Sequence, residues 1–341
     1  MKESLASLFR KHFSESMVSI SEIHAHASQR RIFRLRGKRN LAVGVSNSDI
    51  RENKAFIAFS EHFLSQGLPV PEIFAVNHKE GIYLIEDLGD TTFFDLLRSS
   101  KSDGSVLTTR IKNLLFQIME MLPCFQVKGS KGRHLDYCYP AKTFDRASIL
   151  RDMHYFEREY LGRLSLSYDA KNLHRDFQSL ATFIQGAGTA YFMYRDFQSR
   201  NVMIYKDKAY FLDYQSGRLG PLQYDVVSFL YQSQADFPQS LRDEAIERYL
   251  TILGSMMPFS REEFFCYLDA FLLIRLMQVL GTYGAQGLGQ GKKYFVESIP
   301  YALKNLKVKL PFLRIPLELR ELRFVCETML TQFEEGNLSK I

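Results

Sequence analysis

Short apolar runs alternate with turn residues through the first part of the chain. The stretches RIFRLR and LAVGVS, joined by the turn GKRN, have the every-other-residue pattern of strands, and SEIHAHA before them predicts a third. Residues 49–67 repeat apolar side chains at helical spacing, with Asp49 as the expected N-cap and Gly67 as the stop. IFAVNHKEGIYLIEDLGD then predicts a hairpin of two more strands. We therefore expect a small sheet with one long helix.

From Thr91 onward the apolar spacing becomes helical. Long helical stretches follow one another to the end of the chain, interrupted by one short strand pair, VMIYKDKAYFLDY. The change of pattern predicts an α+β protein with two lobes: a small antiparallel-sheet lobe over residues 1–90 and a large, mainly helical lobe over 91–341. A cleft between such lobes is where ligand chemistry is expected.

Composition places the chain among ordinary globular proteins. Hydrophobic residues make up 46% and charged residues 24%, which disfavours disorder. The net charge of +6 comes from basic residues interleaved with acidic ones, so no nucleic-acid partner is expected. Four cysteines without CxxC spacing indicate reduced thiols. The best apolar run, AFLLIRLMQVL, is short and contains Arg275, so we expect no membrane span and a cytoplasmic protein.

Five consecutive letters, RDFQS, occur twice, in HRDFQSLA and in YRDFQSRN. A phosphoryl-transfer loop needs an aspartate that accepts the proton of the attacking hydroxyl, and oxygen ligands for magnesium nearby. In the second copy Asp196 is followed by Asn201 at D-x-x-x-x-N spacing, and the hairpin beyond it ends in Asp213. The corresponding residues for Asp176 in the first copy are Ala181 and Met193, which cannot bind a metal in this way.

The first copy has the pattern of a helix. Leu173, Phe177, Leu180 and Ile184 recur at helical spacing, which predicts that Asp176 belongs to the surface of a helix. The spacing therefore selects Asp196 as the catalytic base candidate, with Asn201 and Asp213 as metal-ligand candidates.

The stretch YRDFQSRNVMIYKDKAYFLDYQSGRLGPLQYDVVSFLY resembles the aminoglycoside phosphotransferase and choline kinase family, which has a protein-kinase-like fold. Tyr194 stands where that family usually has histidine, and Gly220-Pro221 lacks the family's intervening aspartate. Within the family, YLIEDLGD and RLMQVLGTYGAQGLGQGKKYFVESIP are similar to bacterial kinases that phosphorylate the anomeric carbon of N-acetylmuramate and N-acetylglucosamine.

The resemblance implies ATP and Mg²⁺ as cofactors and assigns roles to particular residues. Asp196 would be the base, Asn201 and Asp213 the magnesium ligands, and Asp225 a structural carboxylate at a helix start. The backbone of Glu86, Asp87 and Leu88 would form the adenine-binding connector.

One expected residue is missing. Kinases of this fold carry a lysine on the third strand that contacts the nucleotide phosphates, and the corresponding position is read as Gly44. HASQRRIF, where a glycine-rich loop is expected, contains no glycine. Arg30, Arg31 or Arg34 could neutralise the phosphates instead, because an arginine fork binds phosphate well.

The sequence leaves more than one function open. The leading hypothesis is an ATP- and Mg²⁺-dependent kinase that phosphorylates a hydroxyl of a sugar or amino sugar, with Asp152, Arg275 and Tyr283 as substrate-side candidates. The missing lysine motivates an alternative, a catalytically silent nucleotide-binding regulatory protein of the same fold. An aminoglycoside- or choline-type kinase is a further alternative.

Overall fold

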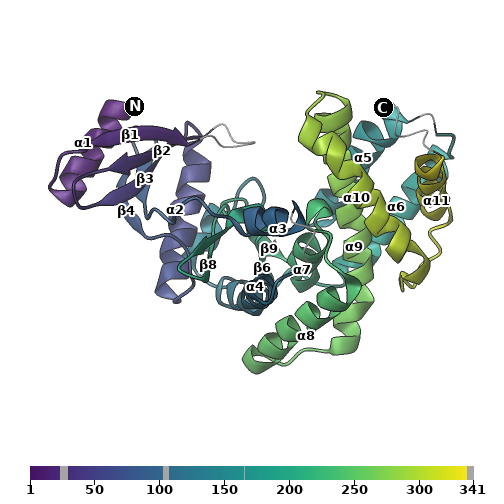
Figure 1. Cartoon of the computed structure of the whole chain (residues 1–341). Coiled ribbons are helices and arrows are strands. Elements are labelled where there is room, and N and C mark those ends of the chain that lie inside the picture. The colour runs from purple at the N-terminus through teal and green to yellow at the C-terminus, as the bar shows by residue number, and fades with distance from the viewer. Residues whose placement is uncertain (24–29, 103–106, 165, 336–341) are drawn as a thin grey trace. The chain divides into compact units, whose positions relative to one another are not determined.

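The computed structural model describes residues 1–23, 30–102, 107–164 and 166–335 (Figure 1). Its internal contacts divide the chain into two compact units, each built from two segments. Unit 1 contains Met1–Lys142 and Tyr194–Arg218, and unit 2 contains Thr143–Met193 and Leu219–Ile341. The lobe boundary after residue 90 stays a prediction.

A five-stranded antiparallel sheet forms the N-terminal part of unit 1, with the order β1-β2-β3-β5-β4. Its strands are β1 (Ser19–Ile23), β2 (Arg31–Arg36), β3 (Leu41–Ser46), β4 (Ile73–Asn77) and β5 (Ile82–Ile85). The strands predicted from RIFRLR, LAVGVS and the following hairpin are confirmed. The strand predicted from SEIHAHA is confirmed up to Ile23, and its remainder lies outside the described residues.

Two helices cover the two faces of this sheet (Figure 1). Helix α1 (Lys2–Phe13) buries its apolar side against one face, and the resulting core consists of Leu5, Phe9, Phe33, Leu35, Ala42, Ile82 and Leu84. Helix α2 (Ile50–Ser65) packs on the other face, where Phe56 stacks on Tyr83 with ring centroids 5.3 Å apart. As predicted, the side chain of Asp49 caps α2, by accepting hydrogen bonds from the backbone N–H groups of Arg51 and Glu52.

The register of the sheet corrects the assignment of Gly44. Gly44 lies opposite Phe33 and Leu84, on the face that α1 covers, and a Cβ atom there would come within 2.9 Å of Leu5 Cδ2. Because successive strand residues point to opposite faces, the residues of β3 on the α2 face are Val43 and Val45. The cross-strand neighbour of Val45 is Tyr83. The position where a phosphate-binding cation is expected is therefore occupied by an apolar side chain.

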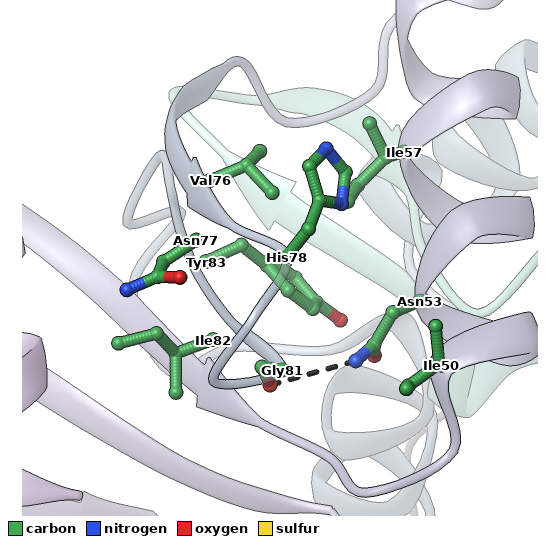
Figure 2. Close-up of a pocket in the computed structure, with 9 residues that line it drawn as sticks. All are labelled: Ile50, Asn53, Ile57, Val76, Asn77, His78, Gly81, Ile82 and Tyr83. Carbon is green, nitrogen blue, oxygen red and sulfur yellow. Dashed lines mark hydrogen bonds between the residues drawn. The ribbon is translucent and has the colours of Figure 1, made fainter.

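The start of α2 is tied to the β4–β5 hairpin beside a small hollow (Figure 2). Asn53 Nδ2 donates to the carbonyl oxygens of Asn47, at 2.9 Å, and Gly81, at 3.5 Å. The backbone N–H of Asn47 donates in turn to Gly81 O at 3.0 Å. The hollow has room for little more than about one water molecule, so it cannot hold a nucleotide.

The rest of unit 1 consists of two helices and a hairpin. These are α3 (Phe93–Ser102), α4 (Thr109–Lys128), β7 (Val202–Tyr205) and β8 (Lys208–Phe211). The β7–β8 hairpin is the strand pair predicted from VMIYKDKAYFLDY, and α3 and α4 pack against it. Phe125 of α4 contacts the ring of Phe211 edge-on, at 4.9 Å between centroids, so the hairpin is anchored on an aromatic core.

Unit 2 is mainly helical, as predicted. Its elements are α5 (Arg146–Glu159), α6 (Ala170–Gln185), β6 (Tyr191–Met193), α7 (Leu222–Leu230), α8 (Gln239–Met256), α9 (Arg261–Tyr283), α10 (Lys293–Lys309) and α11 (Arg320–Glu334). The short strand β9 (Arg218–Gly220) pairs with β6.

Helix α9 is longer than its apolar run suggested. With the turn that follows it, the segment Arg261–Leu288 is long and apolar enough to cross a membrane, which corrects the expectation that it is too short. Its most apolar window is 61% buried within the protein, and α5, α7 and α10 pack against it. Its hydrophobicity is therefore that of a core helix in a helical unit.

We expect Gly81→Ala to destabilise the protein more than Gly67→Ala. Both glycines have positive φ, +64° and +70°, so alanine costs about 1–2 kcal/mol of left-handed strain at either position. At Gly81 the new Cβ would also lie 2.5 Å from the carbonyl oxygen of Asn47, whereas nothing lies within 4 Å at Gly67. The clash should add roughly 1–3 kcal/mol. Urea unfolding of the two variants measures the difference, and equal midpoints would contradict the prediction.

Candidate active site

The predicted catalytic loop and the predicted metal ligand meet at one end of the β7–β8 hairpin. Asn201 ends a short 3-10 turn (Ser199–Asn201) immediately before β7, and Asp213 follows two residues after β8. Because the hairpin reverses the chain, Asn201 and Asp213 come together: Asn201 Nδ2 donates to Asp213 Oδ2 at 3.2 Å. The same nitrogen donates to the backbone oxygen of Asp196 at 2.8 Å. One amide thus joins the three residues that the spacing selected.

Asp196 is held in a defined orientation. The hydroxyl of Ser216 donates to Asp196 Oδ2 at 2.7 Å, which fixes the plane of the carboxylate. The preceding residue, Arg195, has a left-handed backbone with φ of +76°. Strained backbone of this kind persists where surrounding contacts determine it, and it is concentrated at functional sites.

Asp213 is held by several groups, and 39% of its side chain is exposed. It too has left-handed backbone, with φ of +67°. Gln215 Nε2 donates to Asp213 Oδ1 at 2.8 Å, and Arg30 Nη1 approaches the same oxygen at 3.4 Å. Loss of water raises the pKa of Asp213 above its ordinary value and the Asp196 carboxylate raises it further, whereas Arg30 and Gln215 act in the opposite direction. A bound divalent cation would stabilise the ionised form of Asp213, because its positive charge would offset the loss of water and the repulsion from Asp196.

The donor set suits a magnesium ion. Asp213 offers carboxylate oxygens and Asn201 an amide oxygen, and its amide nitrogen is already used within the protein. Oxygen ligands from one or two carboxylates, completed by water, are what Mg²⁺ prefers. Among the described residues, the buried Oε1 atom of Gln215 has no hydrogen-bond partner, which fits a metal-bound water beside Asp213. Asp213 and Asn201 are therefore the residues that would hold the ion.

Tyr194 connects the catalytic loop to the Asp213 segment. Its hydroxyl donates to the backbone oxygen of Leu212 at 2.5 Å, next to Asp213 in the chain. The ring is buried and packs edge-on against Tyr214, Phe125 and Phe197. Tyrosine at this position therefore fixes the spacing between the two loops that carry Asp196 and Asp213.

The three arginines near the start of the sheet have different surroundings. Arg30 pairs with Glu52 of α2 and lies beside Asp213, with 12% of its side chain exposed. Arg31 instead forms a two-pronged pair with Glu22 of β1, at 3.0 and 2.9 Å, and its side chain is 52% exposed. Of the two predicted cofactor-binding arginines, the structure thus brings Arg30 to the site and turns Arg31 away from it.

Arg34 holds the connector that follows β5. Its guanidinium binds both carboxylate oxygens of Asp87, at 2.7 and 3.0 Å, and Asp90 Oδ1 at 2.7 Å. The backbone N–H of Glu86 donates to Glu72 O at 2.9 Å, and Leu88 is buried. The connector is therefore ordered by contacts within unit 1, and adenine binding by residues 86–88 stays a prediction.

The first RDFQS copy is helical, as predicted, but Asp176 is not on the surface. It lies in α6 with 8% exposure, and its Oδ2 accepts a hydrogen bond from the backbone N–H of Leu322 at 2.9 Å. Leu322 is in the first turn of α11, where N–H groups lack partners within the helix. Asp176 therefore caps a helix that lies far along the chain.

The remaining predicted residues lie in unit 2. Asp225 is fully buried in the first turn of α7, as expected for a structural carboxylate at a helix start. Arg275 Nε donates to Ser228 Oγ at 3.0 Å, and Tyr283 OH donates to Ser233 Oγ at 2.9 Å, and both side chains are buried. Asp152 is buried in α5. Substrate contacts by these residues stay predictions.

Sequence reasoning missed Glu52, Gln215 and Ser216. Gln215 and Ser216 directly follow the metal-ligand candidate in LDYQSG, so their polarity was a local signal. Glu52 gave none, because a glutamate in the first turn of a helix is ordinarily a solvated residue that favours the helix dipole.

Known proteins resemble this chain in sequence. The model of the phosphotransferase enzyme family matches residues 19–259. The N-acetylmuramate/N-acetylglucosamine kinase of Pseudomonas aeruginosa is 25% identical over 288 residues, which cover 82% of this chain and 80% of that protein.

Solved structures show the same fold. The choline kinase LicA of Streptococcus pneumoniae superposes with a TM-score of 0.59 at 13% identity, covering 90% of this chain and 99% of that chain. A spectinomycin phosphotransferase, solved with ADP and spectinomycin, gives a TM-score of 0.56 at 13% identity, covering 95% of this chain and 98% of that chain. These likenesses confirm the predicted α+β, protein-kinase-like fold.

We expect Tyr194→Phe to lower the free energy of unfolding by about 1 kcal/mol, the net contribution of one buried hydrogen bond. The ring contacts remain, but the backbone oxygen of Leu212 loses its donor. Tyr210→Phe on β8 is the control, because the contact of this half-buried ring with Tyr205 does not involve its hydroxyl. Urea unfolding should separate the two variants, and equal stability would argue against the link.

Proposed function

Because this chain belongs to the phosphotransferase enzyme family, we propose that it is an ATP- and Mg²⁺-dependent kinase that transfers the γ-phosphate to a hydroxyl of an amino sugar. One observation carries the proposal: Asp196, Asn201 and Asp213 are joined by a single network of hydrogen bonds. This network supplies what phosphoryl transfer asks of a protein, namely a positioned base and oxygen ligands for a metal.

Asp196 is the base in this proposal. With Ser216 on Oδ2, the carboxylate is held in place to accept the proton of the acceptor hydroxyl as that oxygen attacks the terminal phosphorus. The bond between that phosphorus and the bridging oxygen breaks, so ADP leaves and the proton stays on Asp196 until solvent removes it. Positioning and charge stabilisation supply most of the rate in such reactions.

Asp213 and Asn201 hold the metal in this proposal. Mg²⁺ neutralises the developing negative charge on the phosphate oxygens. Gln215 and Tyr194 keep Asp213 in its left-handed conformation, one through its carboxylate and the other through the backbone of the preceding residue. The protein thus contributes two fixed oxygen ligands, and their fixed position lowers the cost of ordering the nucleotide.

The acceptor class follows from the relatives and from charge. The Pseudomonas aeruginosa protein, aligned over most of both chains, is named as a kinase of N-acetylated amino sugars. Polycationic aminoglycosides need several carboxylates around them, because each ammonium must be paired when it leaves water. This chain has a net charge of +6, which disfavours a polycation. The hydroxyl and acetamido groups of an N-acetylated amino sugar are uncharged, so they need no carboxylate partners.

Two alternatives have weaker support. A silent nucleotide-binding protein of the same fold would not need the metal-ligand pair, Asn201 and Asp213, together with an Asp196 carboxylate that the Ser216 hydroxyl holds in place. A choline- or aminoglycoside-type kinase draws on structural neighbours that are only 13% identical, and such a likeness concerns the fold alone. We also propose that the enzyme acts in the cytoplasm, where ATP is available.

We expect Asp196→Asn to lower kcat by about a hundredfold or more, the usual scale for losing a positioned base. Asp176→Asn is the matched control within the same RDFQS pentapeptide. It keeps an acceptor oxygen for Leu322 N–H and should keep kcat within a factor of about two. ADP release in a coupled assay measures both variants. Equal losses of kcat in the two variants would contradict the assignment of the base to Asp196 in the second copy.

The acceptor is tested with a panel of compounds. We expect N-acetylglucosamine or N-acetylmuramate to give ADP release and a phosphorylated product by mass, only with Mg²⁺ present. Kanamycin and choline should turn over more slowly, because the net charge of +6 disfavours cationic acceptors. Faster turnover of kanamycin or choline than of every sugar would overturn the proposed acceptor class, and ADP release from none of them would favour the silent alternative.

A further inference from the structure

A bound triphosphate needs a cation at the end of the sheet nearest Asp213. Its charges would come close to the Asp196 and Asp213 carboxylates, and buried like charges must be compensated. β3 does not supply this cation, since its residues on the relevant face are Val43 and Val45. The compensating charge must then come from another element of unit 1.

Of the arginines at β2, Arg30 alone has the right surroundings. Arg31 is committed to Glu22 on the outer strand, and Arg34 is committed to Asp87 and Asp90 in the connector. Arg30 lies two residues before Ile32, which faces Val45 across the β2–β3 pair. Its ion pairs to Glu52 and Asp213 show that its side chain is directed toward α2 and the catalytic residues.

Glu52 fixes the guanidinium of Arg30. Its Oε1 accepts from Arg30 Nη2, while its Oε2 accepts from Asn47 Nδ2 at 2.7 Å, so both carboxylate oxygens are engaged. Asn47 is fixed in turn, because its side-chain oxygen accepts from the backbone N–H of Asp49, at 3.0 Å, and its own N–H donates to Gly81 O. Asn53 Nδ2 also donates to Asn47 O, so the hydrogen bonds around Asn47 support the position of Arg30.

We propose that Arg30 binds the nucleotide phosphates in place of a strand-borne lysine, and that Glu52 is its positioning residue. This inference rests on the proposed kinase function. The contact to Asp213 is long, 3.4 Å, and the pair with Glu52 is tight. When Asp213 binds the metal, the Nη1 edge of Arg30 can turn to a phosphate oxygen while Glu52 keeps hold of the Nη2 edge. A fork of parallel donors matches phosphate geometry.

The test compares binding of ATP, ADP and adenosine, by calorimetry with Mg²⁺, to the full-length wild type and to variants of Arg30. We expect Arg30→Gln to weaken ATP binding about tenfold or more, as expected on losing a charge-assisted hydrogen bond, and adenosine binding less than about twofold. Arg30→Lys, which keeps the charge but not the fork, should fall between. Arg31→Gln, the neighbouring arginine that pairs with Glu22, is the matched control and should bind all three ligands as the wild type does.

Glu52→Gln tests the positioning role. It should weaken ATP binding by a smaller factor, and Arg30→Gln/Glu52→Gln should bind ATP no worse than Arg30→Gln alone, because Glu52 acts through Arg30. Wild-type ATP affinity in Arg30→Gln, or equal losses for ATP and adenosine, would overturn the assignment and leave the kinase proposal standing. A wild-type protein that binds no adenine nucleotide would overturn both.

A second, independent observation concerns unit 2. His154 and Glu157 on α5 and His174 on α6 bring their ligand atoms within 4.8 Å of one another. Glu157 Oε2 lies 3.2 Å from His154 Nδ1 and 2.8 Å from His174 Nε2. Ligand atoms on one tetrahedral zinc are about 3.3 Å apart, because zinc bonds to nitrogen and oxygen are about 2.0–2.1 Å long. The two distances from Glu157 are close to this spacing, and all three ligand atoms lie within 4.8 Å of one another, so side-chain rotations can bring them around one zinc ion.

We infer that this cluster is a zinc-binding site that clips α5 to α6. Two imidazoles and a carboxylate suit zinc better than magnesium. Tyr168 OH reaches Glu157 Oε1 at 3.5 Å and can orient the carboxylate. The histidine side chains are 40% and 46% exposed, so a water completes the coordination and the ion has an entry path.

Zinc competition with a chromophoric chelator tests this site on the full-length protein. We expect His154→Ala and His174→Ala each to weaken zinc binding roughly tenfold or more, and to remove the increase in Tm that zinc gives the wild type. His78→Ala, at an exposed histidine in unit 1, should leave zinc binding unchanged. Unchanged zinc affinity in both α5 and α6 variants, or no zinc binding by the wild type, would overturn the site.

Discussion

The candidate site in unit 1 depends on keeping the carboxylates of two aspartates, Asp196 and Asp213, close together. Asp196 and Asp213 repel each other, and loss of water penalises the charge of Asp213 further. The fold opposes this with fixed donors: the amides of Asn201 and Gln215, the hydroxyl of Ser216 and the guanidinium of Arg30. Two left-handed residues on the same loops add backbone strain. The arrangement is therefore strained, and a bound cation would stabilise it.

Support for this arrangement reaches back to the N-terminal sheet. Gly81 allows the β4–β5 hairpin to approach Asn47, Asn47 holds Glu52, and Glu52 holds Arg30 beside Asp213. Each step is a short-range contact, yet the chain positions involved lie as far apart as 30 and 213. The start of α2 is thus capped by Asp49, and through Glu52 it also holds the guanidinium of Arg30 beside Asp213.

Much of the fold could be predicted because its signals are local. Alternation located the strands, helical spacing and a cap located α2, and the D-x-x-x-x-N spacing placed Asn201 because six consecutive residues fold as one loop. The errors arose where residues far apart in the sequence determine the direction or the burial of a side chain. Gly44 was read as the position of the missing lysine, whereas strand register turns it toward α1, and Asp176 was placed on the surface because its partner, Leu322, lies 146 residues away. Glu52 resembled any solvated helix residue until Arg30 was located beside it.

The repeated RDFQS pentapeptide has a consequence for measuring local stability. Its first copy continues α6, and its second forms a loop that begins with a left-handed arginine. An amide's intrinsic exchange rate with deuterium is set mainly by its own and the preceding side chain. The four internal amides of the two copies therefore share the same intrinsic rates. Their ratio of observed rates then gives the difference in local opening free energy directly, without a reference peptide. The molecule thus carries an internal standard for comparing its helical unit with its catalytic loop.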